Sequence, residues 1–159
     1  MQITLITFGR LKEKYFIEAS KEYEKRLSAY CKIEVKEIEQ SRLSQNPSQN
    51  EIELALRDET AKIKKAIPQS AQVVTLCIEG KMQDSIELSK TLEGLRVSGC
   101  GKLCFIIGGS YGLSDEIKAM SKLKLSMSKM TFPHRLARIM LLEQIYRAYK
   151  ITEGGTYHK

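Results

Sequence analysis

Residues 105–112 read FIIGGSYG, an apolar run that passes directly into a cluster of glycines. Such a short, uninterrupted run is typical of a strand covered on both faces of a parallel sheet. Glycines at the carboxyl end of the strand let the backbone approach a ligand closely. Their spacing is GGxxG rather than GxGxxG, and no suitably placed acidic residue follows to bind a ribose, so a Rossmann dinucleotide site is poorly supported. A tight turn that requires a positive φ is the alternative explanation of these glycines.

Strand-like and helix-like patterns alternate along the rest of the chain. Apolar or alternating runs predict strands at residues 3–8, 32–38, 72–78, 103–107 and 123–127. Apolar steps of three and four, with capping signals, predict helices around 16–30, from about 51 to just before Pro68, from Asp84 to about 97, from about 115, and from Pro133 to about 152. This alternation predicts a single α/β domain over residues 1–159, with a mainly parallel sheet flanked by helices. Polar residues 40–50 are expected to form a loop.

The composition is that of a soluble globular protein, with 42% hydrophobic and 28% charged residues among 159. The N-terminus lacks the features of a signal peptide, and no apolar run is long enough to span a membrane, so a cytoplasmic protein is expected. The four cysteines form no metal-binding or redox motif, and we expect buried, reduced thiols. They are Cys31, Cys77, Cys100 and Cys104. Neither a metal site nor a Ser-His-Asp arrangement is expected.

Most of the excess positive charge lies near the C-terminus. Residues 120–159 carry a net charge of +6, out of a formal +7 for the whole chain. General solubility is one explanation of this charge, and contact with the phosphates of a nucleic acid is the other. The concentration of charge beside the glycine cluster favours the second.

Two more strand ends have the composition of a binding loop. Residues 126–133 (SMSKMTFP) offer backbone N–H and C=O groups and apolar walls, which suit a flat heterocycle such as adenine. Residues 76–80 (LCIEG) end the preceding strand. Together with the glycine cluster, these segments predict a pocket built from three loops. Packing of the methionines in the core is the alternative interpretation.

The last helix has an unusually wide apolar arc, which covers about half of its circumference. The arc is formed by Ile139, Leu141, Leu142, Ile145, Tyr146, Ala148 and Tyr149. Contact with both the sheet and a second subunit would explain this width and predicts a homodimer. A single deeply buried helix is the alternative. Arg135 and Arg138, in its first turn, are expected to face the glycine loops, where a fixed positive charge suits phosphate or an anionic base.

Six motifs, in this order along the chain, resemble the RlmH (YbeA) family, the bacterial large-subunit rRNA pseudouridine methyltransferases of the SPOUT class. They are GRLK from Gly9, LCIEGK from Leu76, FIIGGSYG from Phe105, MTFPH from Met130, EQIYRA from Glu143 and YHK from Tyr157. The resemblance implies a SPOUT fold with a C-terminal trefoil knot, a homodimer and S-adenosylmethionine as the methyl donor. It also implies N3 of a pseudouridine in 23S rRNA, within the assembled 70S ribosome, as the acceptor.

Residue by residue, the resemblance places the cofactor contacts on the three predicted loops. These contacts are Leu76, Gly108, Met127, Ser128, Lys129, Met130, Thr131 and Phe132. A side chain at position 108 is expected to crowd the pocket.

The terminal residues Tyr157 and His158 match the motif that completes the neighbouring subunit's site. With Arg135 they are the expected catalytic residues, while Arg138 and Lys159 are expected to hold the RNA; positive charge stabilises the imide anion of the acceptor. No general base is assigned. From the residues alone, an enzyme with another nucleotide cofactor and a noncatalytic RNA-binding protein stay open.

Overall fold

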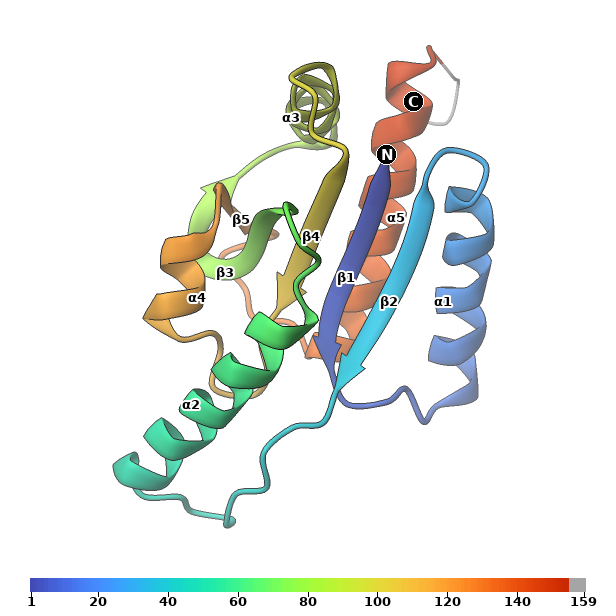
Figure 1. The fold of residues 1–159 in the computed structure, drawn as a ribbon. Helices are drawn as coiled ribbons and strands as arrows, with labels where there is room; N and C mark the ends of the chain where they lie inside the picture. Colours follow the sequence, from blue (N-terminus) through green and yellow to red (C-terminus); the bar gives the residue numbers. More distant parts are fainter. Residues whose placement is uncertain (155–159) are drawn as a thin grey trace.

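The structure, a computed structural model, describes residues 1–154 and is built around a five-stranded sheet (Figure 1). The strand order is β2-β1-β4-β3-β5, and each neighbouring pair runs parallel. The strands are β1 (Gln2–Phe8), β2 (Lys32–Ile38), β3 (Gln72–Met82), β4 (Lys102–Ile107) and β5 (Leu123–Ser126). The helices are α1 (Lys14–Leu27), α2 (Gln49–Ala66), α3 (Ser85–Val97), α4 (Asp115–Met120) and α5 (His134–Thr152). The predicted α/β fold with a parallel sheet is therefore confirmed.

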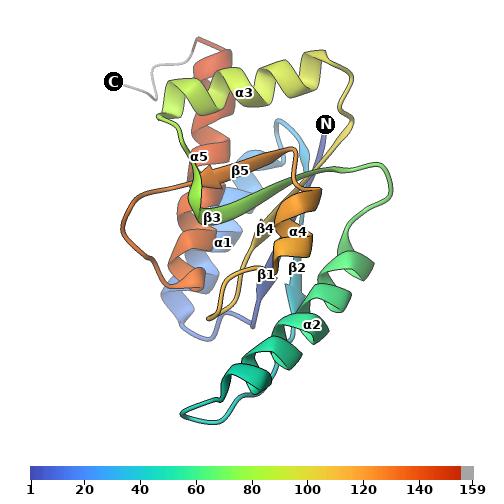
Figure 2. The same cartoon turned by 90° about the vertical axis from the view of Figure 1, so that its left-hand side faces the viewer.

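Helices cover both faces of the sheet (Figure 2). Helices α1, α3 and α5 pack together on one face, and α2 and α4 lie on the other. The alternation of side chains along a strand explains this arrangement. On β1, Ile3 and Leu5 join the core beneath α5, whereas Ile6 and Phe8 join the core beneath α4. A central strand of this kind must be apolar at nearly every position, as the sequence of β4 also is.

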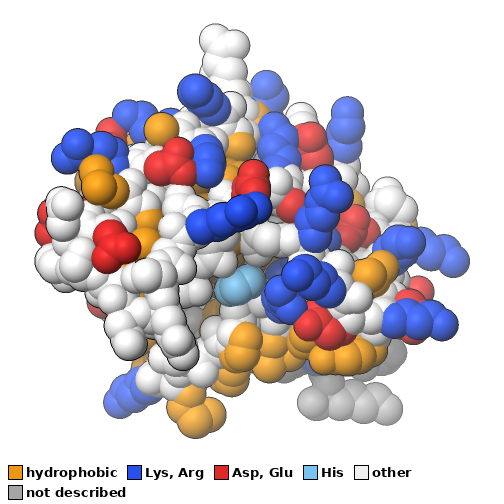
Figure 3. Space-filling view, turned by 90° about the horizontal axis from the view of Figure 1, so that it is seen from below, with side chains coloured by type: hydrophobic (Ala, Val, Ile, Leu, Met, Phe, Trp, Pro, Cys, Tyr) orange, Lys and Arg blue, Asp and Glu red, His pale blue; other side chains and the backbone are white. Residues whose placement is uncertain are grey.

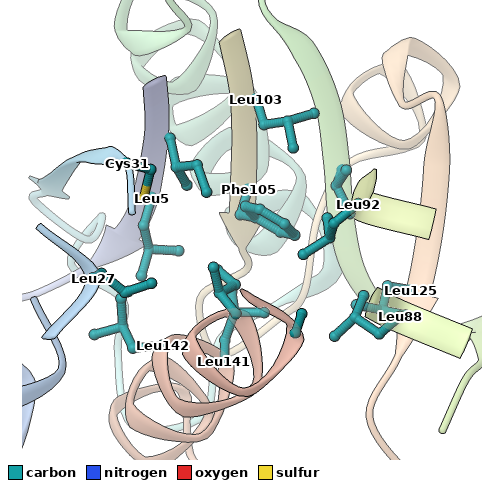
Figure 4. Close-up of a cluster of buried hydrophobic side chains, with 14 of the residues drawn as sticks. Leu5, Leu27, Cys31, Leu88, Leu92, Leu103, Phe105, Leu125, Leu141 and Leu142 are labelled. Carbon is teal, nitrogen blue, oxygen red and sulfur yellow. The ribbon is translucent and has the colours of Figure 1, made fainter. Parts of the chain in front are cut away.

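The larger of the two cores lies between the sheet and α5 (Figure 4). Phe105 of β4 is fully buried there, together with Leu141 and Leu142 of α5. Leu88 and Leu92 close the core from the side of α3. The residues directly before the glycine cluster are thus fixed by packing, so β4 is a rigid support for the loop that follows.

Local sequence signals set most of the element boundaries. Ser48 and Asp84 each form a complete capping box at the start of α2 and α3. The prediction that Pro133 is the first residue of the last helix is wrong. Pro133 is the N-cap, with an extended ψ of 137°, and its carbonyl accepts the first helical bond from the N–H of Ala137 at 2.9 Å.

β3 extends four residues further than the sequence pattern predicts, through an irregular segment. Leu76 and Lys81 both pair with Leu125 of β5, so the intervening residues bulge out of the ladder. Gly80 makes this possible, because a Cβ there would lie 2.6 Å from the carbonyl carbon of Leu125. The bulge directs residues 77–79 toward the carboxyl edge of the sheet.

All four cysteines are free, and Cys31, Cys100 and Cys104 are buried. Cys77 departs from the prediction, because it lies on the bulge of β3 and is only half-buried. No helix in residues 1–154 is long and apolar enough to cross a membrane. The trefoil knot implied by the resemblance stays a prediction.

Candidate functional site

A pocket of about 950 Å³ lies at the carboxyl ends of β3, β4 and β5. Ligands of open α/β sheets bind at this edge, because the loops that follow parallel strands converge there. The pocket is lined by residues 76–79 of β3, by the glycine loop of residues 107–113 and by the segment of residues 125–134. The three-loop pocket predicted from the sequence is therefore present.

The glycine loop turns back on itself after β4. Gly112 donates its N–H to the carbonyl of Gly109 at 3.1 Å and has a positive φ of 77°. A Cβ on Gly108 would lie 2.7 Å from the carbonyl carbon of Gly112. The two explanations of these glycines hold together: Gly112 supplies the left-handed turn, and Gly108 lines the pocket with bare backbone. The expected crowding at position 108 is corrected, since the added atom meets the loop itself.

Hydrogen bonds of serine side chains shape the segment between β5 and α5. Ser126 Oγ donates to the carbonyl of Ser128 at 3.0 Å, and Ser128 Oγ accepts from the N–H of Met130 at 3.0 Å. These bonds fold the segment into a turn that lines the pocket. Seven of the eight predicted cofactor contacts line the pocket, namely Leu76, Gly108, Met127, Ser128, Met130, Thr131 and Phe132. Lys129 is the exception and does not line it.

Arg135 and Arg138 do not face the glycine loops, which corrects the predicted orientation of both side chains. Arg135 Nη1 lies 2.6 Å from a carboxylate oxygen of Glu13. Arg138 is 6% exposed, and its Nη1 lies 2.6 Å from a carboxylate oxygen of Glu37. The carboxylates of Glu13, at the N-cap of α1, and of Glu37, on β2, attract the two guanidinium groups away from the pocket. Tyr157, His158 and Lys159 lie outside the described residues.

The positive charge of the C-terminal region is therefore partly neutralised by acids from the N-terminal third. Seen from below, the side toward which β1, β2 and β4 point in Figure 1, basic and acidic side chains are interspersed, and apolar side chains gather along one rim (Figure 3). The excess positive charge of residues 120–159 therefore does not form a separate basic surface on this side of the molecule.

Packing within the chain accounts for the wide apolar arc of α5. Leu141, Leu142, Ile145 and Ala148 are buried in the core. The rings of Tyr146 and Tyr149 rest against Tyr30, with centroids 5.9 and 5.5 Å away. The alternative of one deeply buried helix explains most of the pattern, so the width of the arc does not by itself require a second subunit.

Three side chains on the pocket wall were not assigned a role from the sequence. Burial lowers the pKa of His134, with a smaller contribution from the positive charge of Arg135, so its imidazole is neutral at physiological pH. Glu79 and Lys118 also line the pocket and form an ion pair at 2.5 Å. Lys118 carried no signal in the sequence, since it is one lysine in a short helix. Within residues 1–154, no group of His, Cys, Asp and Glu side chains could hold a metal ion.

Side chains of the 40–50 loop and of α2 form hydrogen bonds to the glycine loop and to the residue that follows it. Gln40 Nε2 donates to Ser110 Oγ at 2.8 Å, and Thr60 Oγ1 donates to Ser114 Oγ at 2.6 Å. Gly109 sits directly above these hydrogen bonds, because a Cβ there would lie 3.3 Å from Gln40 Nε2. A loop without an expected role in chemistry thus helps to hold one wall of the pocket.

We expect replacement of Thr60 by valine to lower the free energy of unfolding by about 1 kcal/mol, because a buried hydrogen bond is lost without a change of shape. Urea denaturation measures this loss. Thr60→Ser, which keeps the hydroxyl group, is the matched control and should retain more of the stability. Equal stability of the valine variant and the unaltered chain would contradict a role for the Thr60–Ser114 bond.

The comparisons with known proteins agree with this geometry. A family model described as "Predicted SPOUT methyltransferase" matches residues 1–158. Proteins named ribosomal RNA large subunit methyltransferase H are 46% identical over 159 residues in Clostridioides difficile and 49% identical over 160 residues in Clostridium botulinum. In both cases the match covers 100% of each chain. A solved structure from Haemophilus influenzae, described as a methylase family protein, has a TM-score of 0.56 at 12% identity and covers 99% of this chain and 70% of its own.

The parallel sheet and the loop-built pocket at its carboxyl edge define an α/β protein whose pocket is lined mainly by backbone, hydroxyl and apolar groups, as in sites for organic ligands. The match over residues 1–158 and the full-length identity to curated relatives specify the family further. The chain belongs to the SPOUT methyltransferase family.

Proposed function

We propose that this chain is an S-adenosylmethionine-dependent methyltransferase that methylates N3 of a pseudouridine in 23S rRNA of the assembled 70S ribosome. The observation that carries the proposal is the pocket at three strand ends, which contains seven of the eight residues that the RlmH resemblance assigns to the cofactor. The names of the full-length relatives support ribosomal RNA as the acceptor.

The pocket fits the proposed cofactor. Loop 127–132 presents backbone N–H and C=O groups, and Leu76 and Phe132 provide apolar walls for a flat adenine ring. Gly108 lines the pocket with bare backbone, and its lack of a side chain allows the tight turn with Gly112. When bound, S-adenosylmethionine supplies a methyl group activated by its sulfonium.

The chain's own contribution is to hold the acceptor in line and to favour loss of the imide proton. Arg135 follows His134, which lines the pocket, and the proposal places its guanidinium beside the acceptor when the RNA is bound. A positive charge there stabilises the imide anion. This role requires Arg135 to exchange its contact with Glu13 for one with the RNA. We assign Tyr157, His158 and Lys159 the same neighbourhood by resemblance alone. Arg138, which its charge led us to expect at the RNA, is 6% exposed and paired with Glu37, so the proposal gives it no direct contact with the acceptor.

The active form in this proposal is a cytoplasmic homodimer of single-domain chains. Met130 and Leu136 support it, because they are 69% and 36% exposed and an apolar contact would cover them. Met130 also lines the pocket. In the homodimer the terminal residues of one subunit complete the pocket of the other.

The test is transfer of labelled methyl groups to ribosomes purified from a strain that lacks this protein. We expect label in 23S rRNA of 70S ribosomes and little in free 23S rRNA, with the modified base identified by mass spectrometry. A chain that lacks residues 157–159 is expected to bind S-adenosylmethionine but to transfer no methyl group. Absence of label from rRNA with the full-length chain would overturn the proposed function, and binding of NAD instead would favour another cofactor.

A further inference from the structure

The pocket is almost free of charge, with one exception. Among the described residues that line it, the only lysine, arginine or acidic side chains are Glu79 and Lys118. Their ion pair joins Lys118 Nζ to a carboxylate oxygen of Glu79 at 2.5 Å. Every other lining side chain is apolar, hydroxyl-bearing or the neutral His134. A single pair of opposite charges therefore marks one particular place on the wall.

Two different elements bring these charges together. Glu79 lies on the bulge of β3, whose exit from the ladder depends on Gly80. Lys118 lies on α4, beyond the glycine loop. The side chain of Glu79 is 53% exposed and that of Lys118 is 22% exposed, and both line the pocket. The contact lowers the pKa of Glu79 and raises that of Lys118, which keeps both groups charged at physiological pH.

An accessible ion pair of this kind contributes little to folding, because water already solvates both charges. Rearranging this ion pair around a ligand therefore costs little free energy. A ligand that carries one ammonium and one carboxylate can bond to both side chains at once and form two charge-assisted contacts. S-adenosylmethionine has such a group at its amino-acid end, whereas its adenosine part offers neither charge.

We infer that Glu79 and Lys118 form the subsite for the aminocarboxylate end of the cofactor. Glu79 accepts hydrogen bonds from the ammonium, and Lys118 donates to the carboxylate. This inference rests on the proposed function, since it concerns the same pocket. It assigns specificity to the pair: the three loops hold the adenosine part, and the pair selects for a ligand with the amino-acid end attached.

Calorimetry with two thioethers, both of which lack the sulfonium charge, isolates that end of the ligand. S-adenosylhomocysteine carries the aminocarboxylate, and 5′-methylthioadenosine lacks it. We expect Glu79→Gln and Lys118→Met to weaken binding of S-adenosylhomocysteine by about tenfold each, the range of a lost charge-assisted bond. Binding of 5′-methylthioadenosine should stay unchanged. Lys64→Met is the matched control. Lys64 of α2 forms an ion pair of the same length, 2.5 Å, with Glu116 of α4, and neither residue lines the pocket.

Three results would overturn the inference. Equal losses for both thioethers would show that the pair serves the adenosine part or the shape of the loops. Unchanged affinity for both would show that the pair does not contact the ligand. Failure of the unaltered chain to bind either thioether would refute the proposed function itself and the subsite with it, a result that the variants cannot mimic.

Discussion

Gly108→Ala is expected to weaken binding of S-adenosylhomocysteine by about 100-fold or more, equivalent to roughly 2.7 kcal/mol. The added Cβ would lie 2.7 Å from the carbonyl carbon of Gly112 and 2.8 Å from its oxygen. Both atoms belong to the backbone of a tight turn, so no side chain can rotate out of the way. The turn must open, and the wall of the pocket moves with it. A larger residue such as valine is expected to have the same effect, because the first added carbon already breaks the loop.

Gly94→Ala is the control for this experiment. Gly94 lies in α3, no atom would lie within 4 Å of its Cβ, and alanine there should stabilise the helix by about 0.5–1 kcal/mol. Its affinity for the thioether should equal that of the unaltered chain. Calorimetry gives the affinity, and thermal unfolding shows whether each variant is folded. Normal binding by a folded Gly108→Ala chain would contradict the proposed role of the glycine loop.

Arg138→Met is expected to lower the free energy of unfolding by about 2–3 kcal/mol, because a buried charge that pairs with two acids is removed. Arg138 also donates from Nε to Ser20 Oγ at 3.1 Å, and its Nη2 lies 3.6 Å from Glu24. The methionine removes the positive charge that both Glu24 and Glu37 contact. These carboxylates are about one-third exposed, which keeps the loss below that of a fully buried pair.

Urea denaturation measures this loss, with Arg96→Met as the control. Arg96 forms an exposed pair with Glu93 at 2.6 Å, and its removal should leave the stability almost unchanged, because water solvates both charges. Arg138→Met combined with Glu37→Gln should lose less than the single variant, since one uncompensated acid is gone. If Arg138→Met kept full stability but failed to methylate ribosomes, Arg138 would be an RNA contact rather than a support of the fold.

Much of the fold could be predicted because the signals for it are local. The apolar runs of β1 and β4 identify strands that are buried on both faces, and capping residues such as Asp84 fix the start of a helix. The three strand-end loops also followed from the sequence, because parallel strands place their carboxyl ends at one edge. The detail of β3 did not, since its bulge depends on how closely β5 approaches Gly80.

Charged residues show where prediction from the sequence ends. Arg135 and Arg138 lie on the last helix near the pocket in sequence, yet they pair with Glu13 and Glu37, more than 100 positions away. No motif in the sequence around Lys118 indicated a function, yet Lys118 forms an ion pair with Glu79 on the pocket wall. A charge interacts with whatever lies a few ångströms from it in space, and its position along the chain carries little information about that partner.

By itself, the sequence determined the order of the elements and the loops that form the pocket, because hydrophobic periodicity and glycine placement act on neighbouring residues. Only the tertiary structure decided which charges are buried with a partner and which stand on the pocket wall. It also decided that Gly108 serves the turn of its own loop, with the 40–50 loop holding that turn from behind. These contacts join residues far apart in the chain, and the packing of the sheet and its helices brings them within bonding distance.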